Sequence, residues 1–354
     1  MKKILITPLL VVLVAGFVFG GCAEPAPAPA PAPAPTPAPP AKPIELVFST
    51  YNSEAMYRTQ SMLQWEEKIE KATNGRVYFT NYFGGALIGA LDALPELLQG
   101  TADIAEITSH REKGGFPIQL ATANWFFGAK DLDTAVSVYF QAQEKFPEAA
   151  AEWSKVKRLM SHGTGPHHLH SLKPVRKLDD LKGMQVRIPG KTLLETFQKL
   201  GASPVSMPTA DLYMSLEKGI IDCHIQPLEA LMTFALAEVE PYTTMLGFYG
   251  TRAGAHCLNL DSFNRLPPDI QKIIEDSLPE LQQDINDRTV AIDVEGSDFA
   301  NKLGHEWIEL SPEDLARFGE IAAVEARESA TALDDQGLPG TEIFNFIRQS
   351  IEKG

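Results

Sequence analysis

The sequence predicts an α/β protein built from two Rossmann-like lobes. Residues 179–229 alternate short apolar strands with helices, in the order strand, helix, strand, helix, strand, with tight glycine turns between them. A second alternation of the same kind covers residues 44–107. Such patterns indicate mostly parallel sheets, which bind ligands beyond the ends of their strands. At 354 residues and 44% hydrophobic content, the chain is long enough for more than one core.

The N-terminus is predicted to be an export signal outside the fold. Lys2 and Lys3 form a positive start, and Leu9–Val18 is an apolar run too short to span a membrane comfortably. Small residues then precede Cys22, which resembles a bacterial lipobox. That resemblance implies that residues 1–21 are a lipoprotein signal peptide and that Cys22 becomes the lipidated first residue. The alternative is an ordinary secretory signal with an incidental cysteine, and either pattern implies export.

Residues 22–43 are predicted to be a tether. The stretch from Ala23 to Lys42 is nearly all alanine and proline, a composition that favours extended polyproline II and cannot build a core. About twenty residues at ~3.1 Å each would hold a domain up to ~60 Å from its anchor. The tether and the lipobox support each other. Together they predict a protein exported and lipid-anchored at the outer face of the bacterial cytoplasmic membrane, in the periplasm.

Composition limits the partners. The formal net charge is −15 and no long basic block occurs, so nucleic acid is not an expected partner. Beyond the signal, no apolar run is long enough to cross a membrane. With Cys22 assigned to lipid, Cys223 and Cys257 remain, both in apolar, strand-like runs. In an exported protein they could form a disulfide, and two buried free thiols are the open alternative.

The first lobe is predicted as two strand–helix–strand units. Its elements are strands over Ile44–Phe48, Val77–Phe83 and Ile104–Ile107, and helices over Met56–Ala72 and Ala90–Leu98. Asn52 lies in the loop at the carboxyl end of the first strand, and Glu106 lies at the end of the third. A merely solvated carboxylate is found more often on a helix face. Glu106 is therefore a candidate for the ligand site, with a salt bridge at the rim as the alternative.

The stretch 179–229 carries the strongest candidate. A strand over Met184–Ile188 contains Arg187, and a guanidinium inside a strand is costly unless an anion meets it. That anion could be a ligand, or one of the carboxylates of Asp222, Glu195 and Glu229. The other elements of this stretch are a helix from Leu193, a strand over Val205–Met207, a helix over Asp211–Lys218 and a strand from Ile220 to Gln226.

The rest of the chain is mostly helical. Helices are expected over Leu132–Lys145, Ala149–Lys155 and Ile270–Leu303, from Ser311 onward and after Gly340, with one further strand over His256–Leu260.

Residues 161–170 hold half of the chain's eight histidines, with three competing interpretations. Imidazoles are good zinc ligands, but no helical H-x-x-x-H spacing occurs, and a strand would point His167 and His168 to opposite faces. Alternatively, His167 could donate a hydrogen bond to a substrate, with a charge that depends on pH. In the third interpretation, His168, His170 and their neighbours are polar groups at the surface or between the lobes.

Three blocks of the central stretch are more specific. DLKGMQVR, LGASPVSMP and LEKGIID occur in this order, and they closely resemble the solute-binding proteins of tripartite ATP-independent periplasmic (TRAP) transporters, the DctP-type family. Weaker similarity covers nearly all of the chain after Lys42. The resemblance implies a periplasmic binding protein-like fold of type II, with two lobes joined by hinge strands and a long bracing helix. Lobe I is expected over residues 44–164 plus about 253–290, and lobe II over residues 165–252 plus about 291–354.

The resemblance also implies ligand contacts. A strand arginine grips a substrate carboxylate in that family, and Arg187 matches its position. His167 matches a position where many members have a second arginine, and Gln226 one where asparagine is usual. The loss of that second arginine argues against a doubly charged ligand. Glu106 matches a position that lines the cleft, and Asn259 matches an asparagine beside the hinge.

Aromatic residues are further candidates. In the family, the segment that contains Trp125 and Phe126 passes over the cleft, so these rings are expected to stack on the ligand or contact its apolar part. A place in the core is the alternative for both. Phe248, Tyr249 and Arg252 could edge the cleft.

The predicted function is that of an extracytoplasmic solute receptor. It would capture an organic acid, a monocarboxylate with an aromatic or apolar part, close about a hinge and deliver it to TRAP transporter membrane subunits. An exported metal-dependent enzyme that uses the His162–His170 cluster, or a sensory ligand-binding module, is the alternative. Neither G-x-S-x-G nor H-E-x-x-H occurs in the sequence. No catalytic residue, metal site or cofactor is expected, although some relatives use a divalent cation to bridge carboxylates.

Overall fold

The structure, a computed structural model, describes residues 42–109, 112, 115–122, 125–188, 193–249 and 254–353. The chain from Lys42 onward forms one compact unit. The predicted signal peptide, the lipidation site Cys22 and the tether lie outside the described residues. Among the described helices, none combines the length and the hydrophobicity that a membrane span needs.

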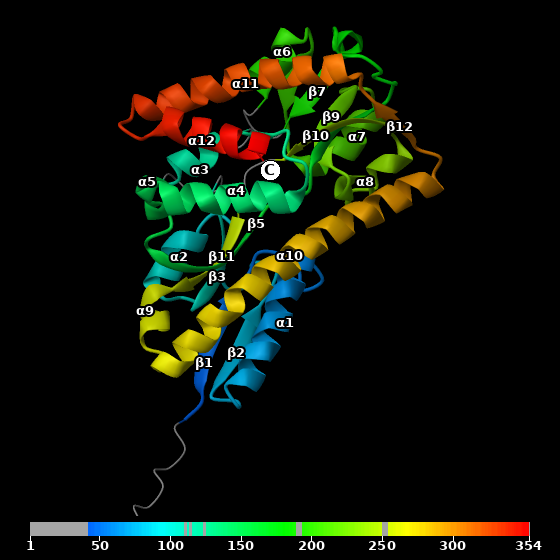
Figure 1. Ribbon diagram of the computed structural model, residues 1–354. Coiled ribbons are helices and arrows are strands. Elements are labelled where there is room, and N and C mark those ends of the chain that lie inside the picture. The colour runs from blue at the N-terminus through cyan, green and yellow to red at the C-terminus, as the bar shows by residue number, and fades with distance from the viewer. Residues whose placement is uncertain are drawn as a thin grey trace, which may run out of the picture. The chain divides into compact units, whose positions relative to one another are not determined.

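A five-stranded sheet contains the first strands of the described chain (Figure 1). Its order is β2-β1-β3-β11-β5. The bounds are β1 (Ile44–Ser49), β2 (Val77–Tyr82), β3 (Ile104–Thr108), β5 (Val156–His162) and β11 (Gly254–Asn259). Strand β1 pairs in parallel with β2 and β3, whereas β11 is antiparallel to β3 and β5. Helices α1 (Tyr57–Ala72) and α2 (Ala93–Gln99) connect the parallel strands, and α9 (Leu260–Asn264) follows β11.

A seven-stranded sheet forms the other half, in the order β12-β10-β6-β9-β7-β8, with β4 paired to β10. The bounds are β4 (Phe126–Phe127), β6 (His167–Ser171), β7 (Gln185–Ile188), β8 (Ser203–Ser206), β9 (Cys223–Pro227), β10 (Tyr242–Tyr249) and β12 (Glu306–Glu309). Short helices connect these strands: α6 (Leu194–Lys199), α7 (Leu212–Glu217), α8 (Glu229–Thr233) and the 3₁₀ turns η3 (Leu178–Leu181), η4 (Thr209–Asp211) and η5 (Leu236–Glu238). We call the two sheets the first and the second sheet.

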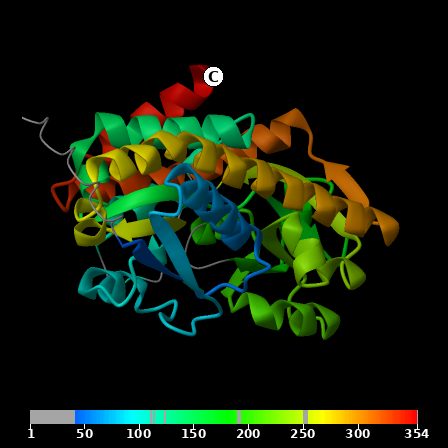
Figure 2. The ribbon, with the colours of Figure 1, turned by 90° about the horizontal axis from the view of Figure 1, so that it is seen from below.

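One long helix connects the two sheets. Helix α10 (Pro268–Lys302) packs on α1 and β5 of the first sheet and on α8 beside the second. Figure 2 shows α10, yellow to orange, running past elements of both halves. The contact with α8 requires Gly296, because a Cβ at this position would lie 2.2 Å from the carbonyl oxygen of Leu228. The predicted bracing helix is therefore present, with close backbone packing against the second half.

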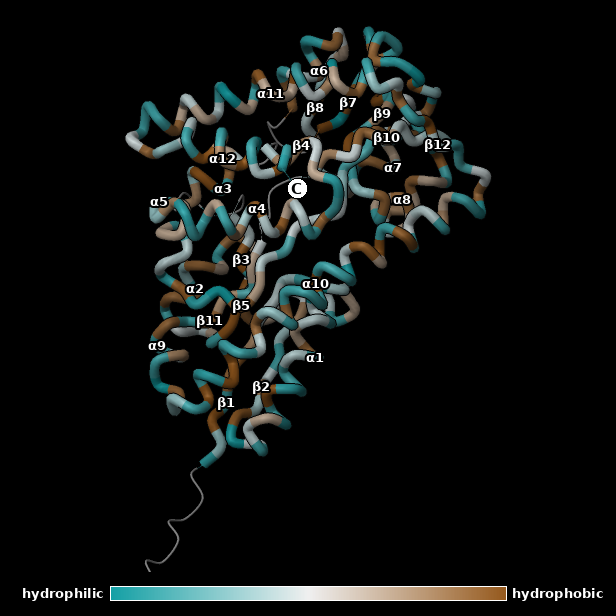
Figure 3. Tube along the Cα trace, in the orientation of Figure 1, coloured by the Kyte–Doolittle hydropathy of each residue, from teal (hydrophilic) through white to brown (hydrophobic). Residues whose placement is uncertain are grey.

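The remaining helices build a shared core. Helices α3 (Pro117–Ala121), α4 (Leu132–Lys145) and α5 (Pro147–Ala151) pack with the two C-terminal helices, α11 (Pro312–Asp334) and α12 (Gly340–Lys353). In Figure 3 the helices alternate hydrophobic and hydrophilic colour along their length, as expected for helices with one buried face. Separate apolar clusters lie under the first sheet and under the second.

The predicted α/β class, with two sheets and a bracing helix, is confirmed. The chain passes between the sheets at residues 163–166, again between β10 and β11, and a further time through α10 to β12. Strand β4 is an exception, because residues 126–127 were expected in lobe I but pair with the second sheet. Cys223 and Cys257 are free, buried thiols on β9 and β11, so the disulfide alternative does not hold.

Candidate functional site

Arg187 is buried in the second sheet. Only 3% of the residue is exposed on β7, between β8 and β9. Its Nε and Nη2 donate to the carbonyl oxygen of Met207, at 3.1 and 3.0 Å, and Nη2 also donates to Thr209 Oγ1 at 3.1 Å. Nη1 is buried and has no hydrogen-bond partner. Burial lowers the pKa of Arg187, but an arginine remains cationic in proteins.

The ion-pair alternative for Arg187 is not observed. No described residue places a carboxylate oxygen within ion-pair distance of it: Glu195 instead pairs with Lys199, and Asp222 accepts the backbone N–H of Gln185. A buried cation that meets only neutral oxygens carries an uncompensated desolvation cost. The arrangement suits an anion that is not part of the protein.

His167 lies on β6, and the charge of Arg187 influences its pKa. Its ring stacks on Phe248, with centroids 5.0 Å apart and planes inclined by 23°. Burial, together with the charges of His168 and Arg187, lowers the pKa of His167 to about 4, so the ring is neutral at pH 7. Its Nδ1 has no hydrogen-bond partner. A neutral imidazole with one unused nitrogen can accept or donate one hydrogen bond but adds no second charge.

Gln226 lies on β9, the strand next to His167. Strand β9 pairs with β6, placing Gln226 opposite His168. Gln226 is partly exposed, and no hydrogen bond joins its side-chain amide to another described residue. Its backbone oxygen accepts from His170 Nε2 at 3.0 Å. The amide therefore stays a candidate ligand contact.

Glu106 is the centre of a polar network at the ends of β1 and β3. Its carboxylate accepts hydrogen bonds from Thr50 Oγ1 at 2.6 Å, Tyr51 Oη at 3.1 Å and Asn52 Nδ2 at 2.6 Å. His162 Nε2 lies 3.3 Å away. Burial alone would raise the pKa of Glu106, but the hydrogen bond from His162 and nearby positive charge hold it below the ordinary range. Glu106 is 1% exposed and lies inside the protein, so the rim salt bridge is not observed.

Asn52 is positioned by this carboxylate. One N–H of its amide donates to Glu106, and its backbone N–H donates to Thr50 Oγ1 at 3.1 Å. The residue is partly exposed. The Glu106 carboxylate thus orients the Asn52 amide, and the amide oxygen and second N–H of Asn52 are the polar atoms left to meet a ligand.

The sequence prediction missed Arg58, which lies in the first turn of α1. Its Nε is buried without a hydrogen-bond partner. Burial opposes its charge, but Tyr57, Glu106, Glu229 and Tyr51 raise the pKa of Arg58 above its usual value. Glu106 is on β3 of the first sheet and Tyr51 follows β1, whereas Glu229 follows β9 of the second sheet. Arg58 is therefore close to both halves of the candidate site.

Other acidic groups lie where the two halves meet. Asp293 of α10 accepts the backbone N–H of Glu229 at 2.9 Å, and burial raises its pKa to about 7. Its carboxylate packs on Gly165, where a Cβ would lie 1.7 Å from Asp293 Oδ2. Gly165 is in the segment between β5 and β6, so any larger residue at this crossover would displace the Asp293 side chain.

The structure corrects the expected placement of Trp125 and Phe126. Both are in the core, with 0% and 1% exposed, and Phe126 is in β4, not in a loop over the ligand. Trp125 donates from Nε1 to Ser329 Oγ at 3.0 Å and meets Phe344 edge to face. Neither ring presents a surface to a ligand in this conformation.

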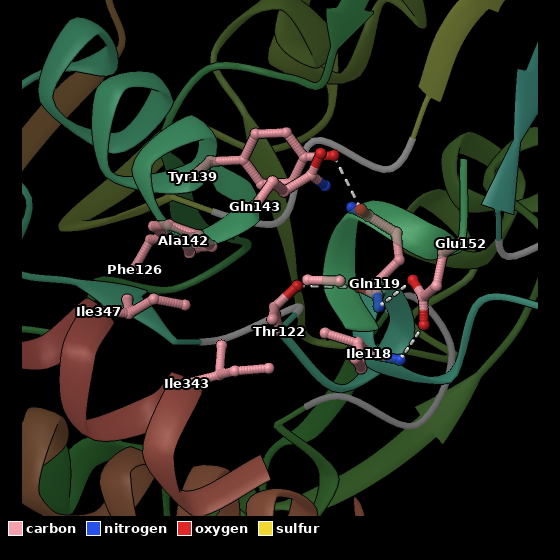
Figure 4. A pocket seen from close by; sticks show the side chains of 11 residues that line it. Ile118, Gln119, Thr122, Phe126, Tyr139, Ala142, Gln143, Glu152, Ile343 and Ile347 are labelled. Carbon is pink, nitrogen blue, oxygen red and sulfur yellow. Dashed lines mark hydrogen bonds between the residues drawn. The ribbon is translucent and has the colours of Figure 1, made fainter. Parts of the chain in front are cut away.

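Phe126 also lines a small cavity under α3, α4 and α12 (Figure 4). The cavity leaves about 20 Å³ of free space, roughly what one water requires. Glu152 accepts the backbone N–H groups of Ile118 and Gln119 there, at 2.6 and 2.9 Å. Figure 4 shows this carboxylate at the start of α3, below the hydrogen bond from Tyr139 to Gln119. The cavity is too small for an organic acid.

A wider depression of about 560 Å³ lies between β10 and the start of α11. It contains His168 but not Arg187, His167 or Gln226. It is not the site built around Arg187.

Asn259 has a structural role. Its Oδ1 accepts the backbone N–H groups of Asp261 and Ser262, at 2.8 and 3.1 Å, and so caps α9. Its Nδ2 donates to the carbonyl oxygen of Leu97 at 2.7 Å. Phe248 stacks on His167 as described, Tyr249 is part of the α4–α12 core, and Arg252 lies outside the described residues.

The histidines of residues 161–170 are divided between the two sheets. His162 is on β5, and His167, His168 and His170 are on β6. His168 Nδ1 accepts from the backbone N–H of Leu246 at 3.2 Å, and His170 bonds to Thr243 and to the Gln226 carbonyl. In the described part of the chain, no three histidine, cysteine or acidic side chains are grouped so that they could hold a metal ion.

Comparison with known proteins gives the family. Residues 48–331 match the sequence model of "Bacterial extracellular solute-binding protein, family 7". A solute-binding protein of Roseobacter denitrificans is 26% identical over 183 residues, 51% of this chain. A protein of Salmonella typhimurium is 26% identical over 220 residues, 59% of this chain. The matches span 55% and 64% of the length of these two relatives.

Solved structures agree with the fold. A TRAP periplasmic solute-binding protein of Desulfovibrio salexigens is 25% identical, with a TM-score of 0.76 over 88% of this chain and 96% of its own. A TRAP solute-binding protein of Rhodoferax ferrireducens, solved with copurified benzoate, is 24% identical, with a TM-score of 0.72 over 88% and 98% of the two chains. The family match covers most of the chain and the fold agrees over nearly all of the described part. The chain belongs to family 7 of the bacterial extracellular solute-binding proteins, the DctP-type solute-binding proteins of TRAP transporters.

Proposed function

We propose that this protein is an extracytoplasmic receptor that binds an organic acid through its carboxylate and delivers it to the membrane subunits of a TRAP transporter. The observation that carries the proposal is Arg187, a guanidinium 3% exposed whose partners are neutral oxygens and whose Nη1 is unpaired. A ligand carboxylate would supply the missing counter-charge through short, charge-assisted hydrogen bonds. Arginine suits this role because its planar fork fits a carboxylate in two-point contact.

The groups around Arg187 favour a ligand with a single carboxylate. His167 is neutral at pH 7, since its pKa is lowered to about 4 by burial and neighbouring charge. Gln226 contributes an uncharged amide. These two side chains can discriminate between ligands by hydrogen bonding without attracting a second anionic group.

An aromatic ligand has less support than the sequence suggested. Trp125 and Phe126 were the reason to expect it, and both lie in the core. The rings of His167 and Phe248 form a stacked pair, and the charge of Arg187 influences the pKa of this imidazole. The Rhodoferax ferrireducens relative carries benzoate, so aromatic acids remain part of the proposed ligand class.

Capture would involve closure about the segments that connect the two sheets. Candidate contacts come from both halves: Asn52 from the first, and Arg187, His167 and Gln226 from the second. A ligand that touches both halves binds the closed state better than the open one and so shifts the population toward closure. Binding and release are the proposed activity, rather than turnover, and no cofactor is part of it.

The anchoring proposal comes from the sequence. Cys22 would be the lipidated residue after removal of residues 1–21, and the Ala/Pro tether would keep the receptor at the outer face of the cytoplasmic membrane. Replacement of Cys22 by serine tests this directly. The variant should be released into the soluble periplasmic fraction and lose its lipid mass, whereas retention in the membrane fraction would contradict the proposal.

A thermal-shift screen of organic acids tests the receptor proposal. Each acid is compared with its own carboxamide, which keeps the shape and removes the charge. A ligand bound only by the native state raises the melting temperature by mass action. At least one acid should stabilise the mature chain while its amide does not. Equal stabilisation by acid and amide, or stabilisation by no acid, would contradict carboxylate capture.

A further inference from the structure

Three buried side chains of the second half are joined by hydrogen bonds in one line. His170 is on β6 and Thr243 lies opposite it on β10, and neither residue is exposed. His305 lies between α10 and β12. Resting on the proposed function, we propose that these three residues form a relay that holds the backbone of Gln226 and so positions its amide for the ligand. We call them the His170–Thr243–His305 relay.

The relay ends on the backbone of Gln226. His170 Nε2 lies 3.0 Å from the carbonyl oxygen of Gln226. On the other side of the same ring, His170 Nδ1 lies 2.8 Å from Thr243 Oγ1. Thr243 Oγ1 in turn lies 2.7 Å from His305 Nε2. Each of these distances is that of an ordinary hydrogen bond, so residues far apart in the chain are joined without a gap.

The chemistry of the groups fixes the direction of every bond in the relay. A carbonyl oxygen only accepts, so His170 Nε2 must carry a proton. In a neutral ring Nδ1 is then an acceptor, and the single hydroxyl proton of Thr243 must point toward it. Thr243 Oγ1 can therefore only accept from His305, which places a proton on His305 Nε2. All donors of the relay point from His305 toward Gln226.

Both rings are neutral at pH 7, as this assignment requires. Burial lowers the pKa of His170 well below its ordinary value, and the neighbouring His224 lowers this pKa further. Burial also lowers the pKa of His305 to about 4, although the backbone of Glu240 acts in the opposite direction. The carboxylate of Glu240 lies 2.6 Å from His224 Nε2, so this acid pairs with a ring outside the relay.

Gln226 lies near the end of β9, and the relay adds a constraint there. In the described residues, β7 pairs with β9 up to His224, two residues before Gln226, whereas β6 continues beside β9 to Pro227. Pro227 has no N–H to donate. The bond from His170 is therefore a further fixed point for the backbone next to the Gln226 side chain.

The position of the amide follows from the position of this backbone. A shift of the Gln226 carbonyl would move the Cα and the side chain with it, and a hydrogen bond weakens away from its best distance and angle. Loss of a relay bond should thus weaken ligand binding, although no group that touches the ligand has been removed. His170, Thr243 and His305 are positioning residues in this sense.

NMR spectroscopy of the mature chain with nitrogen-15-labelled histidine tests the assignment without any ligand. At pH 7, His170 and His305 should both be neutral rings that carry their proton on Nε2. Spectra of His170→Asn and His305→Asn identify the two sets of signals. A proton on Nδ1 of either ring, or a charged ring, would overturn the relay whatever the protein binds.

Calorimetry tests the positioning role, with benzoate, mandelate and butanoate as probes. His170→Gln carries an amide that can donate from the place of Nε2, whereas the amide of His170→Asn reaches only the place of Nδ1. Thr243→Val removes the hydroxyl of the relay. Thr244→Val is the matched control, because Thr244 is equally buried and donates to the carbonyl oxygen of Val175 at 2.7 Å. Melting temperatures show whether each variant is folded.

The probe that the wild type binds most tightly gives the comparison. His170→Asn and Thr243→Val should weaken its affinity about three- to tenfold, whereas His170→Gln and Thr244→Val should stay within about twofold. In a Gln226→Ala background the loss caused by His170→Asn should disappear, because the positioned amide is already absent. A purely structural role of His170 would lower the melting temperature without this coupling to Gln226.

Several results would overturn the inference and leave the receptor proposal intact. These are an unchanged affinity in His170→Asn, equal losses in His170→Asn and His170→Gln or in Thr243→Val and Thr244→Val, and a loss from His170→Asn that persists with Gln226→Ala. If no probe and no acid of the thermal-shift screen binds the wild type, or if Arg187→Met binds as well as the wild type, the proposed function itself fails. The NMR spectra then still decide whether the relay exists.

Discussion

Gly296 provides a sharp test of how the long helix connects the two halves. A Cβ at this position would lie 2.2 Å from the oxygen of Leu228, 2.7 Å from its carbonyl carbon and 2.9 Å from Glu229 Cα. All three are backbone atoms, so no side chain can rotate away. Gly296→Ala must therefore push α10 and α8 apart, and it would strain the hydrogen bond from Glu229 N to Asp293.

Two effects of opposite sign compete in this variant. Alanine favours a helix over glycine by about 1 kcal/mol. Overpacking in a well-packed contact costs about 1–3 kcal/mol, and rigid neighbours place this site at the upper end. We expect a net loss of about 1–2 kcal/mol in the free energy of unfolding. Urea denaturation of the mature chain measures it, with Ser297→Ala, at the neighbouring and partly exposed position, as the control. An unchanged or increased stability would refute the close packing of α10 on α8.

Three further variants test individual groups. Burial raises the pKa of Glu66 to about 8, above its unfolded value near 4.5, so the folded state holds this proton and the free energy of unfolding falls as pH rises from about 4.5 to 8. Glu66→Gln should reduce that fall, measured by urea titrations at pH 5 and pH 8. An unchanged pH dependence, as expected for the exposed control Glu67→Gln, would contradict this prediction. Asn259→Ala removes the cap of α9 and should lower the free energy of unfolding by about 1–2 kcal/mol. Its affinity for the acid found in the screen should stay within twofold of the wild type. A tenfold loss of affinity would indicate that Asn259 contacts the ligand. Trp125→Phe removes the hydrogen bond to Ser329 and should lower the melting temperature without changing that affinity, whereas weakened binding in a folded variant would place the ring in contact with the ligand.

Local patterns were sufficient to predict much of the fold. The helix over Leu132–Lys145 has the predicted bounds, and α10 differs from its expected range by two residues at its start and one at its end. These segments have a clear apolar periodicity, which follows from one buried face. Strands β10 and β12 were not predicted. Their pairing is parallel and joins residues far apart in the chain, so no local pattern indicates it.

The candidate site was predictable only where burial can be read from the sequence. Arg187 follows an apolar strand pattern, and its burial without a counter-ion was the expected result. Arg58 occupies the first turn of an amphipathic helix, where most arginines are solvated. Glu229, which influences its pKa, is far from Arg58 in the sequence and comes near it only through the fold. Two features of the sequence could have drawn attention to Arg58: the polar loop before α1, and the lack of an acidic residue in the first turn of that helix.

The aromatic segment shows the opposite error. Large rings near an expected cleft suggested ligand contact, but Trp125 and Phe126 are covered by α11 and α12 from the end of the chain. Whether a ring is in the core depends on elements that follow it by about two hundred residues, and composition alone does not reveal this.

The most direct measurement is the affinity of wild type and Arg187→Met for the acid that stabilises the mature chain best, by calorimetry at pH 7. The loss of a buried, charge-assisted contact costs about 2–5 kcal/mol, which is roughly a 30- to 5,000-fold weaker affinity. We predict a loss in this range for Arg187→Met and no change for the exposed control Arg76→Met, with both variants folded. A folded Arg187→Met that binds within threefold of the wild type would show that Arg187 is not the carboxylate anchor.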